Sequence, residues 1–571
     1  MTAIDAVGNG IAGRLMSLRG WRRVSVSFLL GALAAAAQPP VHLLPVLLIC
    51  FPGLVWLLDG ARTRRAAFNV GWFFGAGYFA AGLYWVSNAL LVDADRFAWL
   101  IPFTVLGLSL GLGLFTGLMA WAVRLFWKPG VSRVLVLAAT WTVFEGARGI
   151  MFTGFPWNPV GNVWVAFLPV LQGAAWMGVY GLSLVTVFAA AAPAVLTDRR
   201  RHRYPAAFSG LALLAAIAVA GGIRLTAAPD IATDGPVIRI VQPNIAQRDK
   251  WDPRKRSENF ARHLQLSAPT DGARPTHVIW PETATSHDFL TDPVGRTLLR
   301  RVVPAGGLLI TGALRVDRVA GRAVGAHNSL VTVDGQGRAQ AVYDKHHLVP
   351  FGEYIPFRSI LPVEKVTAGA IDFSPGPGPR TLRLPGLPPV SPLICYEAIF
   401  PAKAVLRHDR PEWLLNVTND AWFGRSAGPH QHFASAQLRT VEEGLPLVRA
   451  ANTGISGVVD ARGRIVAAIG LGRQGAIDVP LPAPGPSTIF ARFGNWIPAA
   501  LACVFFVASI MFFRINSLRE MKQTATIWCT FLHTIVSSVN IQPSYSFVVE
   551  YPLHRLKSAI TLVNRLRSNN R

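Results

Sequence analysis

The sequence is poor in charge for its length. Only 15% of its 571 residues are Asp, Glu, Lys or Arg, whereas soluble proteins carry about 25%. The deficit falls mainly in residues 1–230 and near 490–513, and 51% of the chain is hydrophobic. This pattern argues against an ordinary soluble enzyme. It indicates an integral membrane protein with more than one domain.

Acidic residues are scarcer than basic ones, with 31 against 55 and a formal net charge of +24. Such a balance is compatible with nucleic-acid binding, but the arginines cluster in short loops between apolar runs. Loops that stay in the cytoplasm are enriched in Lys and Arg. We therefore expect a membrane as partner and no nucleic acid.

Cysteine is also scarce, and the four that occur are Cys50, Cys395, Cys503 and Cys529. Their spacing indicates neither a zinc site nor a disulfide framework. Cys50 and Cys503 fall in apolar runs and Cys529 in the C-terminal tail, so Cys395 is the only cysteine in a polar insert. We expect no metal and no cofactor.

The apolar runs predict about eight transmembrane helices, most of them near the ~20 residues that a bilayer core requires. They lie at 24–38, 41–58, 68–91, 99–126, 131–147, 173–196, 206–226 and 489–513. The first is short and ends in AAAAQPP, so a cleaved secretory signal is the alternative there.

Loop charge predicts the orientation. The loops before span one and after spans two, four and six are strongly basic, and the intervening loops are nearly balanced. Basic loops remain in the cytoplasm, which places the insert on the far side. The predicted domains are a seven-span membrane domain at 1–226, an extracytoplasmic domain at 227–488, a last span at 489–513 and a basic cytoplasmic tail at 514–571.

The insert alternates short apolar runs with helical patterns, which is typical of a layered α/β domain. Buried strands are expected at 237–245, 277–282, 307–314, 390–397 and 413–420, and a hairpin at 329–344. Helices are expected near 254–268, 293–303, 398–408 and 430–443.

Three residues in the insert have the chemistry of a nucleophilic site. Cys395 falls between a strand and an expected helix, where a helix N-terminus lowers a thiol pKa; a small buried core residue is the alternative. Glu282 ends a strand and suits a general base, or it is a solvated turn residue. Lys345 ends a hairpin strand and suits an oxyanion, or it is a surface lysine. His346 and His347 are adjacent on a strand and point to opposite sides, which argues against a shared metal.

Together these residues resemble the Glu–Lys–Cys triad of the nitrilase superfamily, which implies an αββα sandwich. The contiguous stretches WPETA, YDKHHLVPFGEYIPF, FSPG, LICYEAIFP, NVTNDAWFG and QHFASAQLRTVEEGLPLVRAANTG resemble the bacterial apolipoprotein N-acyltransferases. This resemblance covers about 24–513 and leaves the tail unexplained.

The resemblance implies a ping-pong acyl transfer in the bacterial inner membrane, with the catalytic domain on the periplasmic side. Cys395 takes an acyl chain from a phospholipid, typically phosphatidylethanolamine, as a thioester. The amine of a diacylglyceryl-cysteine at an apolipoprotein N-terminus then accepts it. Glu282 moves the protons and Lys345 supports the oxyanion.

Further residues match the family more loosely. Glu353 and Glu397 are expected to orient Lys345 or polar substrate groups, with an ordinary salt bridge as the alternative for each. Trp251 and Tyr396 are expected to line the acyl path, and Trp251 is equally suited to anchor at the membrane interface.

Two other functions stay open from the sequence. A membrane-anchored amidase that hydrolyses small carbon–nitrogen substrates would use the same triad, although an anchor needs only one span. A transporter or assembly factor whose insert only binds would be expected to carry charged residues within its spans, and the predicted spans hold almost none.

Overall fold

The computed structural model of the chain describes residues 10–198, 202–227, 235–268, 275–285, 293–320, 322–356 and 372–514, together with Thr526 and Thr530. The chain divides into two compact units, Met1–Phe513 and Arg514–Arg571. Nearly all of the tail predicted at 514–571 lies outside the described residues. The elements below belong to the first unit, apart from the last residue of its final helix.

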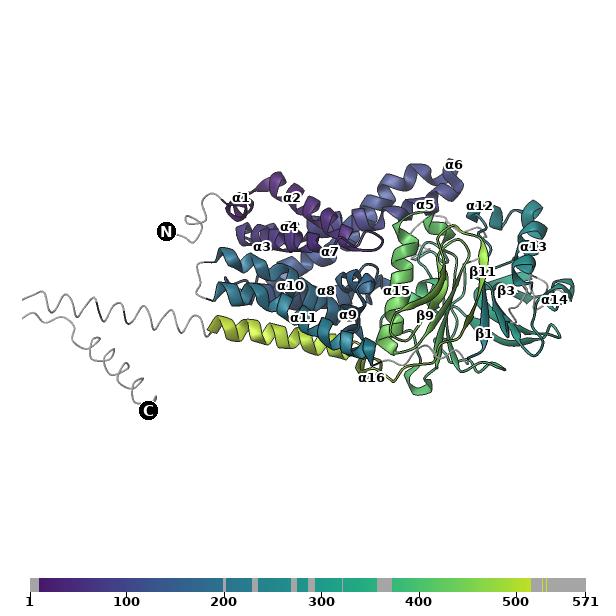
Figure 1. Cartoon of the computed structure of the whole chain (residues 1–571). Helices are drawn as coiled ribbons and strands as arrows, with labels where there is room; N and C mark the ends of the chain where they lie inside the picture. Colours follow the sequence, from purple (N-terminus) through teal and green to yellow (C-terminus); the bar gives the residue numbers. More distant parts are fainter. Residues whose placement is uncertain are drawn as a thin grey trace, which may run out of the picture. The chain divides into compact units, whose positions relative to one another are not determined.

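The N-terminal part of this unit is helical, and its helices gather beside the sheets in Figure 1. A large apolar cluster that includes Phe51, Leu54, Val70 and Val134 holds them together. The helices are α1 (Ile11–Ser17), α2 (Gly20–Ala34), α3 (Leu47–Gly60), α4 (Arg64–Leu83), α5 (Ser87–Leu90), α6 (Ala94–Phe97), α7 (Ile101–Val123), α8 (Val131–Arg148), α9 (Leu168–Leu171), α10 (Ala174–Ala191) and α11 (Arg203–Thr226).

Four stretches of the described residues are long and apolar enough to cross a membrane: Arg64–Val123, Ala174–Thr197, Arg203–Thr226 and Trp496–Arg514. Helices occur at all eight predicted spans, but the count of eight spans is not confirmed. The helix α2 has 15 residues and α3 has 14, which is short of the ~20 that a bilayer core requires. The last predicted span is also interrupted, because α16 (Ile489–Phe493) ends at Gly494 (φ 56°) before the final helix begins.

The rest of the unit contains two β-sheets. The first has six strands in the order β11-β1-β2-β3-β4-β5, and the second has five in the order β10-β9-β8-β7-β6. In each sheet three neighbouring strands are parallel: β1, β2 and β3 in one, and β6, β7 and β8 in the other. The strands are β1 (Val237–Gln242), β2 (His277–Ile279), β3 (Leu308–Val319), β4 (Arg322–Asp334), β5 (Ala339–Asp344), β6 (Val390–Ile394), β7 (Trp413–Thr418), β8 (Leu447–Ala451), β9 (Ser456–Val459), β10 (Ile465–Ile469) and β11 (Gly475–Pro480).

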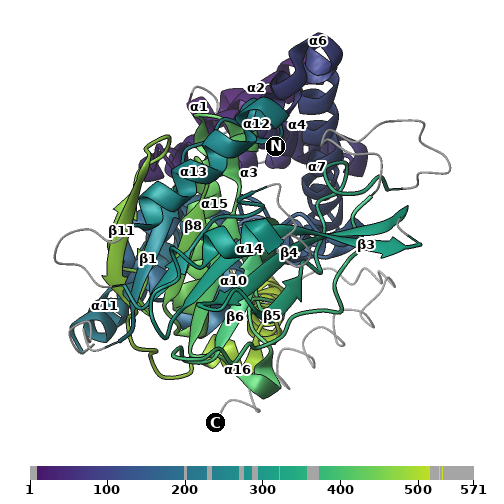
Figure 2. The ribbon, with the colours of Figure 1, turned by 90° about the vertical axis from the view of Figure 1, so that its right-hand side faces the viewer.

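The two sheets pack face to face and are covered by helices. Ile240 and Ile310 of the first sheet share one core cluster with Leu415 and Val448 of the second. The helices α13 (Arg256–Ser267) and α14 (Pro293–Leu299) pack on the outer face of the first sheet through a separate cluster, and Figure 2 shows them in front of it. The sandwich is therefore αββα, as the resemblance implied.

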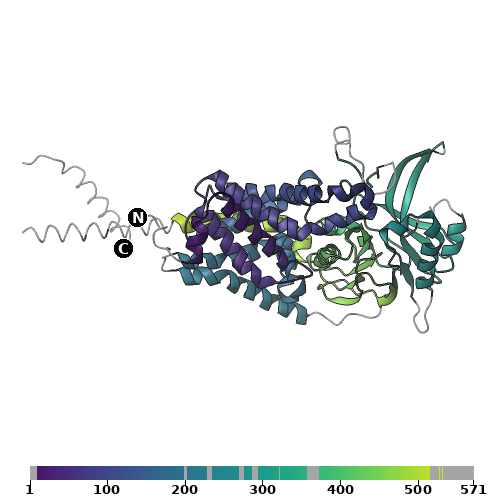
Figure 3. The ribbon, with the colours of Figure 1, turned by 90° about the horizontal axis from the view of Figure 1, so that it is seen from above.

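The outer layer on the second sheet is α15 (Ala427–Glu443). Phe433 and Ala436 pack on this sheet, whereas Leu438 and Val441 pack on α10 of the helical region. Figures 1 and 3 place α15 at the boundary between the two regions. One helix is thus shared by both, and its burial on two sides couples the sandwich to the helical bundle.

Most expected elements of the insert are present, with three differences. Strands β8 to β11 were missed. The hairpin at 329–344 is confirmed, but its first strand extends back to Arg322 and also pairs with β3. The helix expected at 398–408 is wrong: only short 3₁₀ turns occur there, at Cys395–Ile399 and Arg407–Asp409. Pro401 explains this, because the residue before a proline avoids the helical region.

Candidate active site

Cys395 lies at a sharp turn directly after β6. It adopts φ 51°, a left-handed conformation that costs a non-glycine residue about 1–3 kcal/mol and is found mainly at functional sites. The parallel register pairs Ile394 with Val417 of β7, so Cys395 is the first residue beyond the paired part of β6. The side chain is partly buried.

Glu397 stabilises this turn from within. Its carboxylate accepts backbone hydrogen bonds from Ile394 (2.7 Å), His346 (2.9 Å) and His347 (3.2 Å). The Nδ1 of His346 also lies 2.6 Å from it. Burial opposes the charge, but these contacts outweigh it and lower the pKa of Glu397. Glu397 thus supports the segments around Cys395 and Lys345, rather than contacting the Lys345 ammonium.

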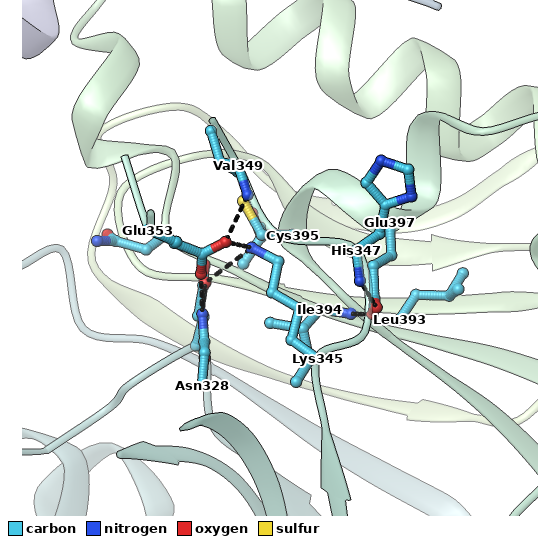
Figure 4. A network of polar contacts seen from close by, with 12 residues as sticks. Asn328, Lys345, His347, Val349, Glu353, Leu393, Ile394, Cys395 and Glu397 are labelled. Atoms are coloured by element: carbon cyan, nitrogen blue, oxygen red, sulfur yellow. Dashed lines mark hydrogen bonds and ion pairs between the residues drawn. The ribbon is translucent and has the colours of Figure 1, made fainter. Parts of the chain in front are cut away.

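Lys345 follows β5 and is almost fully buried. Its ammonium lies 2.8 Å from Oε2 of Glu353 and 3.9 Å from Oε1 of Glu282. Figure 4 shows it pointing toward Glu353 with Cys395 beside it. Burial opposes its charge, but Glu353, Glu282 and Cys395 together raise the pKa of Lys345 well above its ordinary value. The structure thus places Glu353 against Lys345, and its predicted role in orienting the ammonium stays a prediction.

Asn328 of β4 joins the two carboxylates, and no motif in the sequence predicts this role. Its Nδ2 donates to Oε1 of Glu282 at 2.6 Å and to Oε1 of Glu353 at 2.8 Å. The backbone N–H of Val349 donates to the other oxygen of Glu353 at 2.8 Å. These bonds hold both carboxylates around one ammonium.

Glu282 lies in the turn after β2 and is 7% exposed. Lys250, in the short helix α12 (Gln247–Lys250), donates from Nζ to the backbone oxygen of Glu282 at 3.0 Å. Burial lowers the pKa of Lys250 to about 8, against the pull of Glu282 and Cys395. The neighbouring Trp251 is 38% exposed, and its predicted contact with an acyl chain stays a prediction.

The thiol of Cys395 is protonated at rest. Burial raises its pKa, Glu282 raises it further, and Lys345 acts in the opposite direction. The expectation that a helix N-terminus lowers this pKa is wrong, because the element after Cys395 is a five-residue 3₁₀ turn. A nearby base is needed to remove the proton.

A second polar network lies behind the cysteine and was not singled out from the sequence. Nε2 of His432 on α15 lies 3.1 Å from the carbonyl oxygen of Cys395, and Nδ1 lies 2.9 Å from Asp420. Asp420 also pairs with Arg449 at 2.8 Å and accepts from the hydroxyl of Thr418 at 3.0 Å. Asp420 and His432 fall within two of the stretches that carried the resemblance, so a signal for them was present.

The helical region contacts the turn through Tyr396. The hydroxyl of Tyr396 donates to the backbone oxygen of Gly154 at 2.8 Å, and its ring stacks near Phe155. Arg148 holds this loop by donating to the carbonyl oxygens of Phe155 and Trp157 at 2.5 and 2.8 Å.

The helix α8 continues to Arg148, one residue beyond the span predicted at 131–147, and it buries the side chains of Glu145 and Arg148. Oε1 of Glu145 accepts from the backbone N–H of Val160 at 2.9 Å. The two charges therefore organise the loop that meets Tyr396.

No metal-binding group of three or more His, Cys, Asp or Glu side chains occurs in the part of the chain that the structure describes. The class of protein follows from the sandwich and from the cysteine turn that faces a lysine and two carboxylates. It is the carbon–nitrogen hydrolase class, and the family model described as Carbon-nitrogen hydrolase matches residues 238–483. A second model, Apolipoprotein N-acyltransferase N-terminal domain, matches residues 30–192.

Curated relatives extend over nearly the whole chain. An apolipoprotein N-acyltransferase of Rhodopseudomonas palustris is 43% identical over 86% of this chain and 95% of its own length. The protein of that name from Bradyrhizobium diazoefficiens is 44% identical over 84% and 93%, and that from Brucella melitensis 40% over 87% and 97%. The chain belongs to the apolipoprotein N-acyltransferase family.

Among solved structures, an amidase from Nesterenkonia sp. is 19% identical and covers 44% of this chain and 93% of its own, with a TM-score of 0.31. A score this low carries no weight for the fold.

Proposed function

We propose that the chain transfers an acyl chain from a phospholipid to the N-terminal amine of the diacylglyceryl-cysteine of apolipoproteins, with Cys395 as nucleophile. Membership of the family supports the reaction. Phosphatidylethanolamine is the proposed donor.

In the first half-reaction Glu282 takes the proton of the Cys395 thiol, and the sulfur attacks the ester carbonyl. The C–S bond forms and the C–O bond to the glycerol breaks. The lysophospholipid oxygen leaves with the proton held by Glu282. Lys345 stabilises the oxyanion, and its raised pKa keeps it charged throughout.

In the second half-reaction the free amine of the lipoprotein cysteine attacks the thioester. The C–N bond forms, the C–S bond breaks, and the proton lost by the amine passes through Glu282 to the sulfur. Asn328 and Glu353 keep the base and the ammonium in place between the two steps. Dividing one acyl transfer into two is the usual gain of covalent catalysis.

The observation that carries this proposal is the contact between the nucleophile turn and the helical region. Tyr396, adjacent to Cys395, is hydrogen-bonded to Gly154. Ile150 and Phe152 in the same loop are 66% and 81% exposed. An enzyme that acts on small soluble amides does not need an exposed apolar loop beside its cysteine. An enzyme that acts on a lipid does, because the loop can contact the hydrocarbon.

The energetics favour a site at the bilayer. Moving an acyl chain into water costs about 0.8 kcal/mol per CH₂, or roughly 12 kcal/mol for a chain of ~16 carbons. A site that meets the lipid directly avoids most of this cost. We therefore place residues 1–226 and 489–513 in the membrane with eight spans, and 227–488 outside it as the catalytic domain.

Charge supports one orientation of this arrangement. Arg133 at the start of α8 pairs with Asp198 at 2.9 Å and lies 3.5 Å from Asp59 at the end of α3. The start of α8 and the end of α3 therefore lie on the side of the basic loops. Gly154 and α15 lie on the opposite side of the helical region. Basic loops stay in the cytoplasm, so the sandwich faces the periplasm of a bacterial inner membrane.

The test uses the purified full-length chain, vesicles of phosphatidylethanolamine and a diacylglyceryl-modified lipopeptide. We expect the lipopeptide to gain one acyl chain and lysophospholipid to appear in equal amount. Release of ammonia from small amides, with no acylation of the lipopeptide, would instead establish the amidase alternative.

A further inference from the structure

A basic hollow of about 520 Å³ lies where the sandwich meets the helical region. Arg425, His430 and Arg473 line it from the sandwich, and Pro40 and Tyr84 line it from the helical region. None of the described residues that line it is acidic. The hollow therefore brings positive side chains together without a counter-charge in its wall.

The loop that carries Arg473 is held rigidly. Gln242, fully buried at the end of β1, donates from Nε2 to the carbonyl oxygens of Gly470 and Arg473 at 2.9 Å each. Gly472 adopts φ 67°, and a Cβ there would meet Nε of Arg425 at 3.0 Å. The guanidinium of Arg425 thus lies against the backbone immediately before Arg473.

The segment that carries Arg425 is anchored to the helical region. Asn88 of α5 donates from Nδ2 to the backbone oxygen of Phe423 at 2.8 Å. The hydroxyl of Ser426 donates to the same oxygen at 2.7 Å. Both arginines consequently start from fixed backbone positions in the lining of one hollow.

Arg425 and Arg473 both line the hollow, so an anion held there is attracted by two positive side chains. Arginine is suited to phosphate, because its planar fork donates two parallel hydrogen bonds to phosphate oxygens. Apolar surface adjoins these charges: Tyr84, which lines the hollow, is 48% exposed, and Val41 and Leu43, which follow the lining residue Pro40 in the chain, are 64% and 49% exposed. A phosphate group joined to hydrocarbon matches both features.

We propose that this hollow binds the phosphate of a phospholipid, at a site separate from the catalytic cysteine; its location at the periplasmic surface of the inner membrane rests on the orientation proposed above. His430 faces the hollow, while His432 on the same helix contacts Cys395. Residues two apart on an α-helix point about 200° away from each other. The site does not depend on the acyl-transfer proposal, since lipid binding there needs no reaction.

The test measures equilibrium binding to the full-length chain in a nonionic detergent, with Cys395→Ala present throughout so that no lipid is consumed. The probes are dihexanoyl phosphatidylglycerol and, separately, inorganic phosphate. The test variant is R425A/R473A. The matched control is R300A/R322A, which removes the same charge from exposed positions elsewhere on the sandwich.

We expect R425A/R473A to weaken lipid binding about tenfold or more, because two charge-assisted contacts are lost, and R300A/R322A to leave it unchanged. R425K/R473K should retain part of the binding, since it keeps the charge without the fork. Equal lipid binding by R425A/R473A and its parent overturns the proposal. Tight binding of inorganic phosphate without binding of the lipid also overturns it, by making free phosphate the occupant.

Discussion

Glu282 and Glu353 both lie within ion-pair distance of Lys345, but not equally near. The shorter contact, 2.8 Å, is to Glu353, and Glu282 is 3.9 Å away. The oxygen of Glu353 that lies against the ammonium also accepts the backbone N–H of Val349, so its hydrogen-bonding capacity is largely occupied. The looser contact is the reason for proposing Glu282, and not Glu353, as the carboxylate that exchanges protons with Cys395.

Replacing Glu282 with Gln tests this division of roles. The amide keeps the size of the side chain but takes no proton, and we expect acyl-enzyme formation to slow by about 10²–10⁴-fold, the range for a lost general base. The measurement is single-turnover release of lysophospholipid. An E282Q rate within a few-fold of the wild-type rate would show that another group removes the thiol proton.

Lys250 predicts a pH dependence. Burial lowers its pKa to about 8, from an ordinary value of 10.5. Its charge beside Glu282 and Cys395 favours a thiolate, and this charge is lost as pH rises through about 8. We therefore expect acyl-enzyme formation to decline above that pH, and Lys250→Met to be slower at neutral pH without this decline. An unchanged alkaline limb in Lys250→Met would exclude Lys250 as its origin.

The same pKa shift has a consequence for stability. The unfolded state holds this proton up to pH 10.5, whereas the folded state releases it near pH 8. Folding stability from this group therefore rises with pH between those values, and the cost of burying it is complete below about pH 8. At neutral pH the buried charge of Lys250 thus favours the thiolate of Cys395 but lowers the free energy of unfolding.

At the scale of elements, β7, β8 and α15 together hold the turn of Cys395 from behind. Asp420 follows β7, Arg449 is on β8 and His432 is on α15, and all three are fully buried. Burial opposes the charge of Asp420, but Arg449 and His432 lower its pKa to about 2. The carboxylate is therefore ionised at any working pH.

Removing this carboxylate charge should be costly. Asp420→Asn leaves Arg449 buried without its counter-charge, which typically costs about 3–5 kcal/mol, and we expect a clear fall in Tm in detergent. Asp409→Asn is the matched control, since Asp409 pairs with Arg383 at the surface and should leave Tm nearly unchanged. Equal effects of the two substitutions would contradict the supporting role of this network.

The sequence predicted the elements whose signals are local and missed those that depend on distant contacts. WPETA, YDKHH and LICYE each place one reactive residue at a strand end, and the structure brings these ends together. Lys250 and Asn328 reach the site only through tertiary packing, so no motif or spacing in the sequence predicts their presence there. The helix α15 is buried on both sides, so its apolar pattern does not reveal that it packs on both the sandwich and the helical region. The helix expected after Cys395 is absent because of Pro401.

For the whole molecule, the proposed orientation predicts which cysteine substitutions a membrane-impermeant maleimide reaches. Gln336, exposed in the turn between β4 and β5, should be labelled as Gln336→Cys in intact spheroplasts. Arg62→Cys, in a basic loop, should be labelled only after lysis. Both are made in a background in which the four native cysteines, Cys50, Cys395, Cys503 and Cys529, are replaced by Ala. The opposite labelling pattern would place the sandwich in the cytoplasm.

The central claim is that Cys395 carries the acyl chain between donor and acceptor. The direct measurement is mass spectrometry of the full-length chain after incubation with labelled phospholipid and no acceptor. We predict one labelled acyl group, removable by hydroxylamine, on the peptide that contains Cys395. It should be absent from Cys395→Ala and retained in Cys503→Ala. A label on any other residue, or acyl transfer by Cys395→Ala, would contradict the account.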